Sequence, residues 1–148
     1  MKYKNKFCNI YDSLYSSKNY EKECDFILST VGENKRILDV GCGTGTHAGI
    51  LAKKSKSVVG IDISGDMISI ADKKHQNHKN LEFHEISVED LSSNQAGKYD
   101  AIICMFNIVN HLSNLRSLMS FFDSCSSLLS HGGCLMFDCW NSIACGID

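Results

Sequence analysis

The sequence predicts an α/β fold, a doubly wound and mostly parallel sheet with helices on both faces, in one domain. Short apolar runs alternate with segments of helical periodicity, a glycine-rich turn follows the first run, and an acidic residue ends the second. Such alternation is typical of parallel sheets, because each parallel connection needs a crossover segment. With 148 residues the chain has the length of a single domain with one core.

The composition is that of an ordinary globular protein. Apolar residues make up 43% of the chain and charged residues 22%, and the net charge is −2. This balance lacks the basic excess that marks nucleic-acid binding. No apolar run reaches membrane-spanning length, and the first residues lack an apolar signal core. We therefore expect no nucleic-acid partner, no membrane partner and a cytoplasmic location.

The eight cysteines do not form a metal-binding pattern. They include no C-x-x-C pair and have no histidine at zinc-ligand spacing. Several fall inside predicted strands or an amphipathic helix, where cysteine behaves as a small apolar residue. We predict neither a metal site nor a disulfide framework.

Residues 36–47, R-I-L-D-V-G-C-G-T-G-T-H, predict a buried strand, a glycine-rich turn and a helix. Glycines in the turn allow positive φ angles and let a ligand approach without a Cβ in the way. The helix that follows points free N–H groups and the positive end of its dipole at the turn. The stretch therefore predicts a cofactor cradle.

Two acidic residues indicate which cofactor the cradle takes. A dinucleotide fingerprint would read G-x-G-x-x-G, whereas this turn reads G-x-G-x-G and follows Asp39. A carboxylate there is a poor neighbour for a pyrophosphate and a good one for an ammonium group. Asp62 ends the next apolar run and can accept hydrogen bonds from both ribose hydroxyls. A nicotinamide-dependent oxidoreductase is therefore disfavoured.

The stretch D-V-G-C-G-T-G resembles the first motif of class I S-adenosylmethionine (SAM)-dependent methyltransferases. The resemblance covers nearly the whole chain and implies a Rossmann-like strand order of 3-2-1-4-5. It implies SAM as the cofactor and S-adenosylhomocysteine (SAH) as the product. In that family Asp39 and Gly41 face the amino-acid end of SAM, in the turn that also contains Cys42 and Gly43, and Asp62 binds the ribose.

The same resemblance assigns the adenine contacts. It places Ile63 and Met67 beside the adenine ring, although Met67 suits plain core filling equally well. Ser87 stands where the family commonly has an aspartate bonded to the adenine amino group, and its uncharged hydroxyl should bind more weakly. Val88 offers its backbone N–H to the ring.

The stretch M-F-N-I-V-N-H-L resembles the fourth motif of small-molecule methyltransferases, especially of the sugar-modifying group. It implies that the backbone around Met105 and Phe106 faces the methionine part of SAM. Asn107 and His111 are then the polar groups placed to meet a substrate. His111 is our candidate base, because an imidazole titrates near neutrality. The alternative, that His111 caps or pairs beside the following helix, stays open.

The first 33 residues are expected to form a helical cap on a core of residues 34–148. Apolar residues with helical spacing predict two short helices between residues 7 and 31. The phrase Y-D-S-L-Y-S-S-K-N-Y-E-K-E resembles the N-terminal segment of a subgroup that includes amino-sugar N-methyltransferases. It implies that tyrosines here close over SAM. Packing is an equal alternative for Tyr11 and Tyr20, and it is the expected role of Tyr15.

The remaining elements follow from periodicity and capping signals. We expect strands at residues 58–61, 81–86, 98–106 and 134–140, and a helix over residues 67–74 capped by Ser64 or Asp66. His75 and His78 then fall in a solvated linker. A last helix begins at Ser113 or Asn114 and ends at the H-G-G of residues 131–133. Its inward stripe should consist of Leu115, Leu118, Met119, Phe122 and Leu129.

Complete members of the resembled family continue with two more strands, which supply much of the acceptor pocket. Their absence would leave the fifth strand as an open edge. We expect the chain to be a fragment, or its last residues or a second copy in a homodimer to cover that edge. The predicted function is methyl transfer from SAM to a small-molecule acceptor. The alternative is a SAM-binding domain or truncated methyltransferase without an acceptor pocket.

Overall fold

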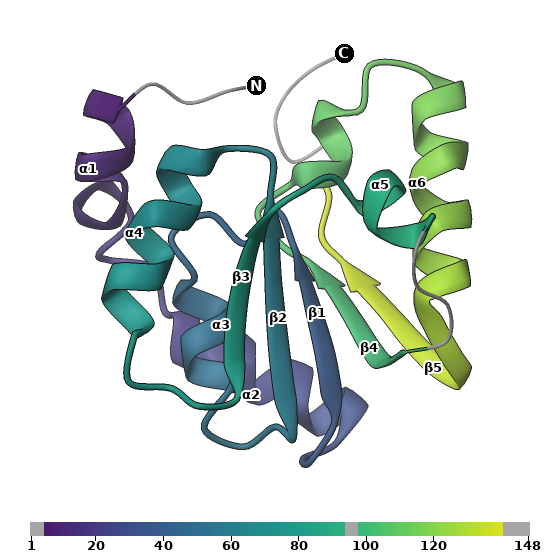
Figure 1. Ribbon diagram of the computed structural model, residues 1–148, viewed down its shortest axis with the longest axis horizontal. Helices are drawn as coiled ribbons and strands as arrows, with labels where there is room; N and C mark the ends of the chain where they lie inside the picture. The colour runs from purple at the N-terminus through teal and green to yellow at the C-terminus, as the bar shows by residue number, and fades with distance from the viewer. Residues whose placement is uncertain (1–4, 94–97, 141–148) are drawn as a thin grey trace.

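The computed structural model describes residues 5–93 and 98–140. Five parallel strands form one sheet in the order β3-β2-β1-β4-β5, as expected (Figure 1). The order reverses between β1 and β4, and doubly wound sheets bind ligands beyond the carboxyl ends of the strands at that point. The strands are β1 Arg36–Val40, β2 Ser57–Asp62, β3 Leu81–Glu85, β4 Tyr99–Cys104 and β5 Leu129–Phe137.

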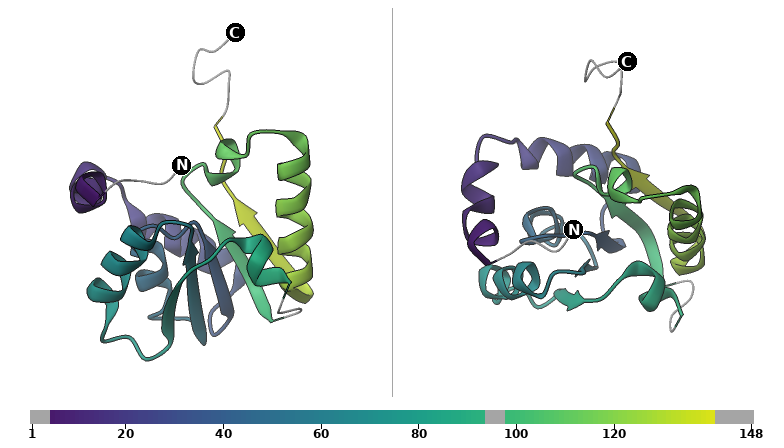
Figure 2. Two further views of the ribbon diagram at one scale, coloured as in Figure 1. Left: turned by 45° about the horizontal axis from the view of Figure 1, so that its top comes forward. Right: turned by 90° about the horizontal axis from the view of Figure 1, so that it is seen from above.

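Helices cover both faces of the sheet, each over its own apolar cluster (Figures 1 and 2). On one face α2 (Tyr20–Val31), α3 (Thr46–Leu51) and α4 (Gly65–His75) pack against residues such as Ile37 and Ile103. On the other face α5 (Val88–Ser92) and α6 (Leu115–Leu128) pack against Leu38 and Ile102. Neighbouring strand residues thus serve opposite clusters, because successive side chains of a strand alternate between faces.

A further helix, α1 (Asn5–Leu14), stands beside α4 and outside the two layers (Figure 2). It and α2 are the two helices that the apolar spacing predicts for the cap. Within the described residues, no helix has the length and apolar character that crossing a bilayer requires.

The inward face of α6 differs from the expected one. Leu115 is 71% exposed and Met119 58% exposed, so both lie on the outer side of the helix. The buried face consists instead of Phe121, Ser124, Cys125 and Leu128. These residues also have helical spacing, and their fit against the sheet decides which stripe turns inward. Asn114 caps the helix as expected, since its side chain accepts a hydrogen bond from the Ser117 N–H at 2.9 Å.

The H-G-G stretch does not end α6, as we expected, but lies inside β5. The helix ends at Leu128 and the strand begins at once with Leu129. Leu129 pairs with Tyr99 and Cys134 with Ala101, so residues 130–133 bulge opposite a single residue of β4. Gly132 has φ +76°, and a Cβ on Gly133 would lie 2.9 Å from a backbone oxygen. The glycines therefore make the bulge possible.

Candidate cofactor cleft

The glycine turn after β1 divides its glycines between two tasks. Gly41, Gly43 and Gly45 all have positive φ angles, between 55° and 75°. A Cβ on Gly45 would lie 2.5 Å from the Phe83 ring, so this glycine permits close packing of the turn on the sheet. A Cβ on Gly43 would meet nothing within 4 Å. Gly43 therefore borders open space that a ligand can occupy.

Backbone hydrogen bonds fix the turn over the end of β2. The N–H groups of Gly41 and Cys42 both donate to the Ile61 carbonyl, at 2.8 and 3.0 Å. The Cys42 thiol sits against Gly60, and burial raises its pKa well above the ordinary value. Cys42 thus holds the turn through its backbone N–H, and it lines neither of the two cavities described below.

His75 packs beneath this turn, and the expectation that it lies in a solvated linker is wrong. It ends α4, and a Cβ on Gly49 would clash with its ring, while one on Gly45 would lie 3.1 Å from it. Its Nε2 is buried and has no hydrogen-bond partner among the described residues. Burial lowers the pKa of the imidazole, which favours the neutral ring that fits beside the two glycines.

Asp39 lies beneath the turn at the centre of the sheet. Its side chain is 2% exposed, and one carboxylate oxygen, Oδ2, has no hydrogen-bond partner in the described part of the chain. Burial, with a contribution from the Asp62 charge, raises the pKa of Asp39 to about 7. A buried acceptor without a partner is costly unless a donor reaches it. This arrangement fits an ammonium group entering the cleft.

Asp62 ends β2 and holds the glycine turn in place. Its carboxylate accepts the Gly43 N–H at 3.0 Å and the Ser64 N–H at 2.9 Å. Ser64 precedes α4 as expected, but its own hydroxyl caps nothing and is buried without a partner among the described residues. Burial raises the pKa of Asp62, although the backbone donors oppose the shift. Asp62 also borders both cavities described below.

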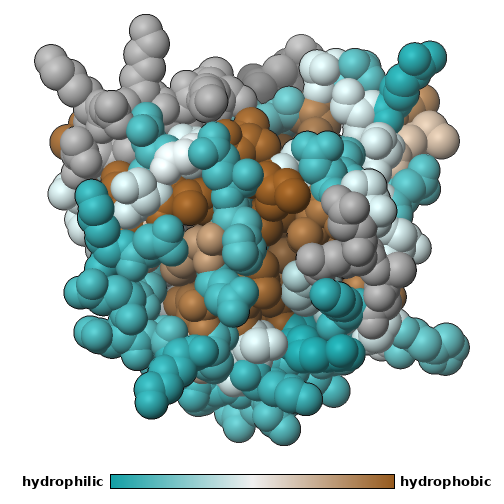
Figure 3. All heavy atoms as spheres, in the orientation of Figure 1, coloured by the Kyte–Doolittle hydropathy of each residue, from teal (hydrophilic) through white to brown (hydrophobic). Residues whose placement is uncertain are grey.

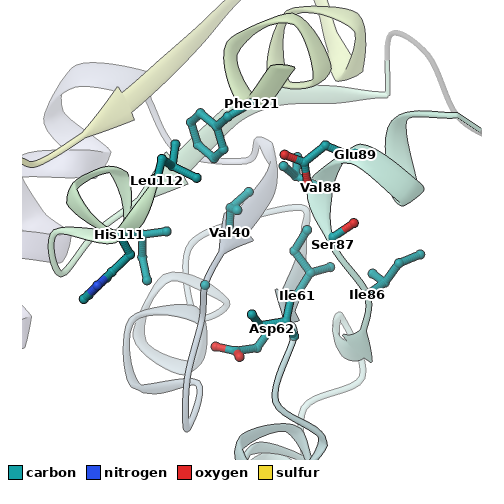
Figure 4. A pocket seen from close by; sticks show the side chains of 13 residues that line it. Val40, Ile61, Asp62, Ile86, Ser87, Val88, Glu89, His111, Leu112 and Phe121 are labelled. Atoms are coloured by element: carbon teal, nitrogen blue, oxygen red, sulfur yellow. The ribbon is translucent and has the colours of Figure 1, made fainter. Parts of the chain in front are cut away.

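The first cavity is an apolar slot of about 260 Å³ at the carboxyl ends of β1 and β2 (Figure 4). Figure 3 shows the same apolar character on this face, where apolar side chains gather over the middle of the sheet and polar ones surround them. Ile63, Ser87 and Val88, the predicted adenine contacts, all line it. A flat aromatic base suits such a slot. Its apolar walls are Val40, Ile61, Ile63, Ile86, Val88, Ile108, Leu112 and Phe121.

The polar side chains that line this cavity differ in whether they are free to bind a ligand. The Ser87 hydroxyl caps α5, because it accepts the Asp90 N–H at 3.1 Å and donates to the Asp90 carboxylate at 2.8 Å. The Glu89 carboxylate points into the cavity (Figure 4). Glu89 was not predicted as a site residue, because Ser87 is the residue that aligns with the family's acid, whereas the acid two positions further along the chain faces the slot.

A second cavity, of about 410 Å³, adjoins the first and shares four lining residues with it. These are Gly41, Asp62, Ile108 and His111. The two cavities therefore form one cleft along the carboxyl ends of β1, β2 and β4. The rest of the second wall comes from Tyr11, Tyr15, Gly43, Met67, Phe106, Asn107 and Trp140. Met67, which is almost fully buried, therefore lines the second cavity, whereas Ile63, the other predicted adenine neighbour, lines the first.

An aromatic cluster around Phe106 closes the cap over the second cavity. The Phe106 ring lies 4.8 Å from that of Tyr15 and 6.1 Å from that of Tyr11, and the Lys18 ammonium lies 3.8 Å from its centroid. Tyr15, expected to serve packing, therefore lines the cavity together with Tyr11.

Tyr20 packs instead between Phe106 and His47, at ring distances of 6.2 and 5.0 Å. Burial raises the pKa of Tyr20 to about 12, so its hydroxyl stays protonated. The His47 ring in turn pairs with Glu23 at 2.8 Å. Tyr20 is therefore a packing residue of the cap in this structure.

Polar side chains also tie α1 to the glycine turn. The Asp12 carboxylate accepts the Thr44 hydroxyl at 2.5 Å and pairs with the Lys74 ammonium at 2.7 Å. Lys74 donates further to the Thr46 hydroxyl at 2.9 Å. Because Thr44 and Thr46 flank Gly45, this network fixes the cap relative to the cradle. Nothing in the local sequence signals it, since its members lie far apart along the chain.

The two predicted substrate residues lie at the η1 turn (Ile108–His111), which follows β4. Asn107 precedes the turn with φ +58°. Ile108 packs onto Gly41, where a Cβ would lie 2.7 Å from its side chain. His111 is exposed, and its ring points to the same side as the Asp62 carboxylate (Figure 4). Met105, just before the turn, packs against the apolar cluster that α2, α3 and α4 cover.

The chain matches a family model described as a methyltransferase domain over residues 37–133. The Bacillus subtilis strain 168 protein YqeM, whose given name places it among the methyltransferases, is 31% identical over 136 residues. The match covers 92% of this chain and 55% of YqeM. The ubiquinone biosynthesis O-methyltransferase of Acinetobacter baumannii strain ACICU is 34% identical over 109 residues, covering 72% and 44%. The chain thus spans about half the length of the curated relatives it matches.

Solved structures share the fold. An S-adenosylmethionine-dependent methyltransferase from Clostridium acetobutylicum matches with a TM-score of 0.76 and 30% identity, covering 91% of this chain and 56% of that one. CalS10 from Micromonospora echinaspora, an amino pentose methyltransferase with SAM bound, matches with a TM-score of 0.79, covering 89% and 56%. At 24% identity the second likeness concerns the fold alone.

Proposed function

The chain belongs to the methyltransferase domain family, and on this premise we propose that it binds SAM in the cleft and transfers the methyl group to a small-molecule acceptor. The resemblance expected from the motifs is confirmed by the family match. The chain spans about half of its curated relatives, so the activity of the whole protein is part of the proposal.

The observation that carries the proposal is the unpartnered Oδ2 of buried Asp39, which lies on β1 just before the turn whose Gly43 borders open space. Asp39 would accept the ammonium of SAM, and Asp62 the ribose hydroxyls. The apolar slot beside Ile63 and Val88 would hold the adenine. When bound, SAM supplies a methyl group on a positively charged sulfur. The leaving group is then the neutral thioether of SAH, so its departure needs no acid catalysis.

The residues around the second cavity would orient the acceptor. Catalysis of methyl transfer is mainly alignment of a lone pair with the S–CH3 bond, so the cleft needs no catalytic triad. Asn107 and His111 border the cavity and would contact the acceptor. If the acceptor is an amine, it must react unprotonated, and His111 is the group placed to take its proton.

Two classes of acceptor are supported by different observations. The N-terminal phrase, which resembles that of the amino-sugar N-methyltransferases, favours an amino sugar. The relative from Acinetobacter baumannii, named as an O-methyltransferase of ubiquinone biosynthesis, favours an acceptor with a hydroxyl group. Both are small molecules, as proposed. The predicted absence of nucleic-acid partners and the cytoplasmic location stay predictions.

Calorimetric titration with SAM and SAH, with NADH as control, tests the cofactor. We expect micromolar binding of both sulfur ligands and no binding of NADH. Failure of folded protein, verified by circular dichroism, to bind either sulfur ligand would overturn the proposal.

Transfer of radiolabelled methyl groups to a panel of amino sugars and dihydroxy-aromatic compounds then tests the reaction. Labelled product is the expected result. Binding of SAM without transfer to any acceptor would favour the second candidate function, a SAM-binding domain that does not catalyse. The coverage of about half of each relative is the observation behind that alternative.

A further inference from the structure

The turn after β4 contains two successive non-glycine residues in the left-handed region. Phe106 has φ +70° and Asn107 has φ +58°. A left-handed conformation is unfavourable for residues with a Cβ, and more so for an aromatic residue than for asparagine. Such strain persists only where surrounding contacts hold it, and it tends to occur at functional sites.

One carboxylate holds both residues in this conformation. Asp138, the residue after β5, accepts the Phe106 N–H on Oδ2 at 3.0 Å and the Asn107 N–H on Oδ1 at 2.6 Å. Its own N–H donates to the Cys104 carbonyl at 3.3 Å. Successive backbone N–H groups of a tight turn form a concave anion site, which Asp138 fills from the neighbouring strand.

This turn determines where three groups of the cleft lie. The Phe106 ring sits at the centre of the tyrosine cluster from the cap. Asn107 begins the η1 turn, whose Ile108 covers Gly41 and whose His111 borders both cavities. A different backbone conformation at residues 106 and 107 would move all of these side chains together.

We propose that Asp138 is a positioning residue of the methyl-transfer site, which fixes the Phe106–Asn107 turn and through it the wall between the two cavities. The inference rests on the proposed function, because the wall matters for catalysis only if SAM occupies the cleft. Asp138 itself lines neither cavity and acts through the backbone it binds.

The test compares the 148-residue chain with Asp138→Asn. Asparagine offers one acceptor oxygen, so one of the two N–H groups loses its partner. We expect the dissociation constant for SAH to rise at least about fivefold and the amides of Phe106 and Asn107 to exchange faster with solvent, as measured by calorimetry and by NMR. Asp138→Glu keeps two acceptor oxygens, so its dissociation constant for SAH and its amide exchange rates should lie between those of the wild type and Asp138→Asn. It provides a second variant if Asp138→Asn does not fold.

Asp100→Asn is the matched control. Asp100 also holds a backbone N–H, that of Arg36 at 2.9 Å, and binds its guanidinium, but at the opposite end of the sheet. This variant should lower thermal stability and leave SAH affinity unchanged. An unchanged SAH affinity in Asp138→Asn, or an equal loss in Asp100→Asn, would overturn the inference while the wild-type protein still binds SAH. Wild-type protein that binds no SAH would instead overturn the proposed function and this inference with it.

Discussion

At the scale of single residues, Asp39 should make both the stability of the fold and the affinity for SAM depend on pH. Its pKa is about 7 in the fold, above the ordinary value near 4, because the carboxylate is buried beside Asp62. The folded chain therefore holds this proton more tightly than the unfolded chain does. The contribution of Asp39 to stability is present below about pH 4 and is lost as the pH rises to about 7.

We predict that SAM binding releases this proton. An ammonium beside Asp39 favours the carboxylate, so affinity should rise with pH up to about 7, by at most about tenfold per unit for one proton. Titrations at pH 6 in buffers of different ionisation enthalpy measure the release, and Asp39→Asn should abolish most of it. Binding at pH 6 without any proton exchange would contradict the assignment of the ammonium to Asp39.

Asp62 has two tasks, and its removal should affect both. We predict that Asp62→Ala weakens SAM binding by about 1.5–3 kcal/mol, because two charge-assisted ribose hydrogen bonds are lost and the Gly43 N–H loses its acceptor. Calorimetry with SAH measures the change. Asp72→Ala, which removes an exposed acid of the following helix α4, is the control and should bind like the wild type. Equal affinities for Asp62→Ala and wild type would show that the ribose lies elsewhere.

Asp39, Gly41 and Asp62 lie in or directly after the strands that the motifs predict, whereas several of their partners could not be predicted. Gly41, Asp39 and Asp62 belong to a short local pattern, so their relation survives in the sequence. Asp138 binds residues more than 30 positions away, and no local pattern marks such a contact. The polar neighbours of His75 in the sequence predict a solvated side chain. Its ring is half-buried because Gly49, which lacks a Cβ, leaves space for it.

At the scale of elements, the attachment of α1 depends on a few polar contacts. Asp12 is its link to Thr44 and Lys74, and Tyr11 and Tyr15 on the same segment line the second cavity. We predict that Asp12→Ala loosens α1 by about 1 kcal/mol, since these contacts are partly exposed. Amide exchange within α1 should quicken by about fivefold, as measured by mass spectrometry.

Asp25→Ala on the exposed side of α2 is the control for this change and should leave the exchange of α1 unaltered. SAH affinity should fall a few-fold in Asp12→Ala alone, because the tyrosines no longer close the cavity. Unaltered exchange in α1 would mean that the aromatic cluster, and not Asp12, holds the helix.

The elements show how far periodicity decides a fold. All five strands were predictable, because each buried parallel strand is a short apolar run between polar turns. Their order came from the family resemblance and not from periodicity. The orientation of α6 was not, since Leu115 and Met119 form one helical stripe and Phe121 and Cys125 another. Only contact with the sheet selects between them. The bulge in β5 was missed because its glycines also fit a helix end.

At the scale of the whole molecule, β5 is one of the two outer strands of the described sheet and pairs with β4 alone. Apolar side chains accompany it: Phe137 is 42% exposed and Trp140 62%. A homodimer through this strand, one of the three alternatives that the sequence left open, stays a prediction, and sedimentation equilibrium tests it. We expect the wild-type chain to sediment as a dimer and the Phe137→Glu variant to sediment as a monomer. A mass of 16.4 kDa at all concentrations would contradict it.

The central claim is that SAM binds along the carboxyl ends of β1, β2 and β4, and mapping of SAH onto the amide NMR spectrum tests it most directly. We predict shifts at Gly41, Gly43, Asp62 and Val88, and none at Arg36, at the opposite end of the sheet. Gly43→Val, which places a branched side chain in the open space of the turn, should show no shifts at all. Shifts that avoid the glycine turn, or a spectrum that SAH leaves unchanged, would contradict the account.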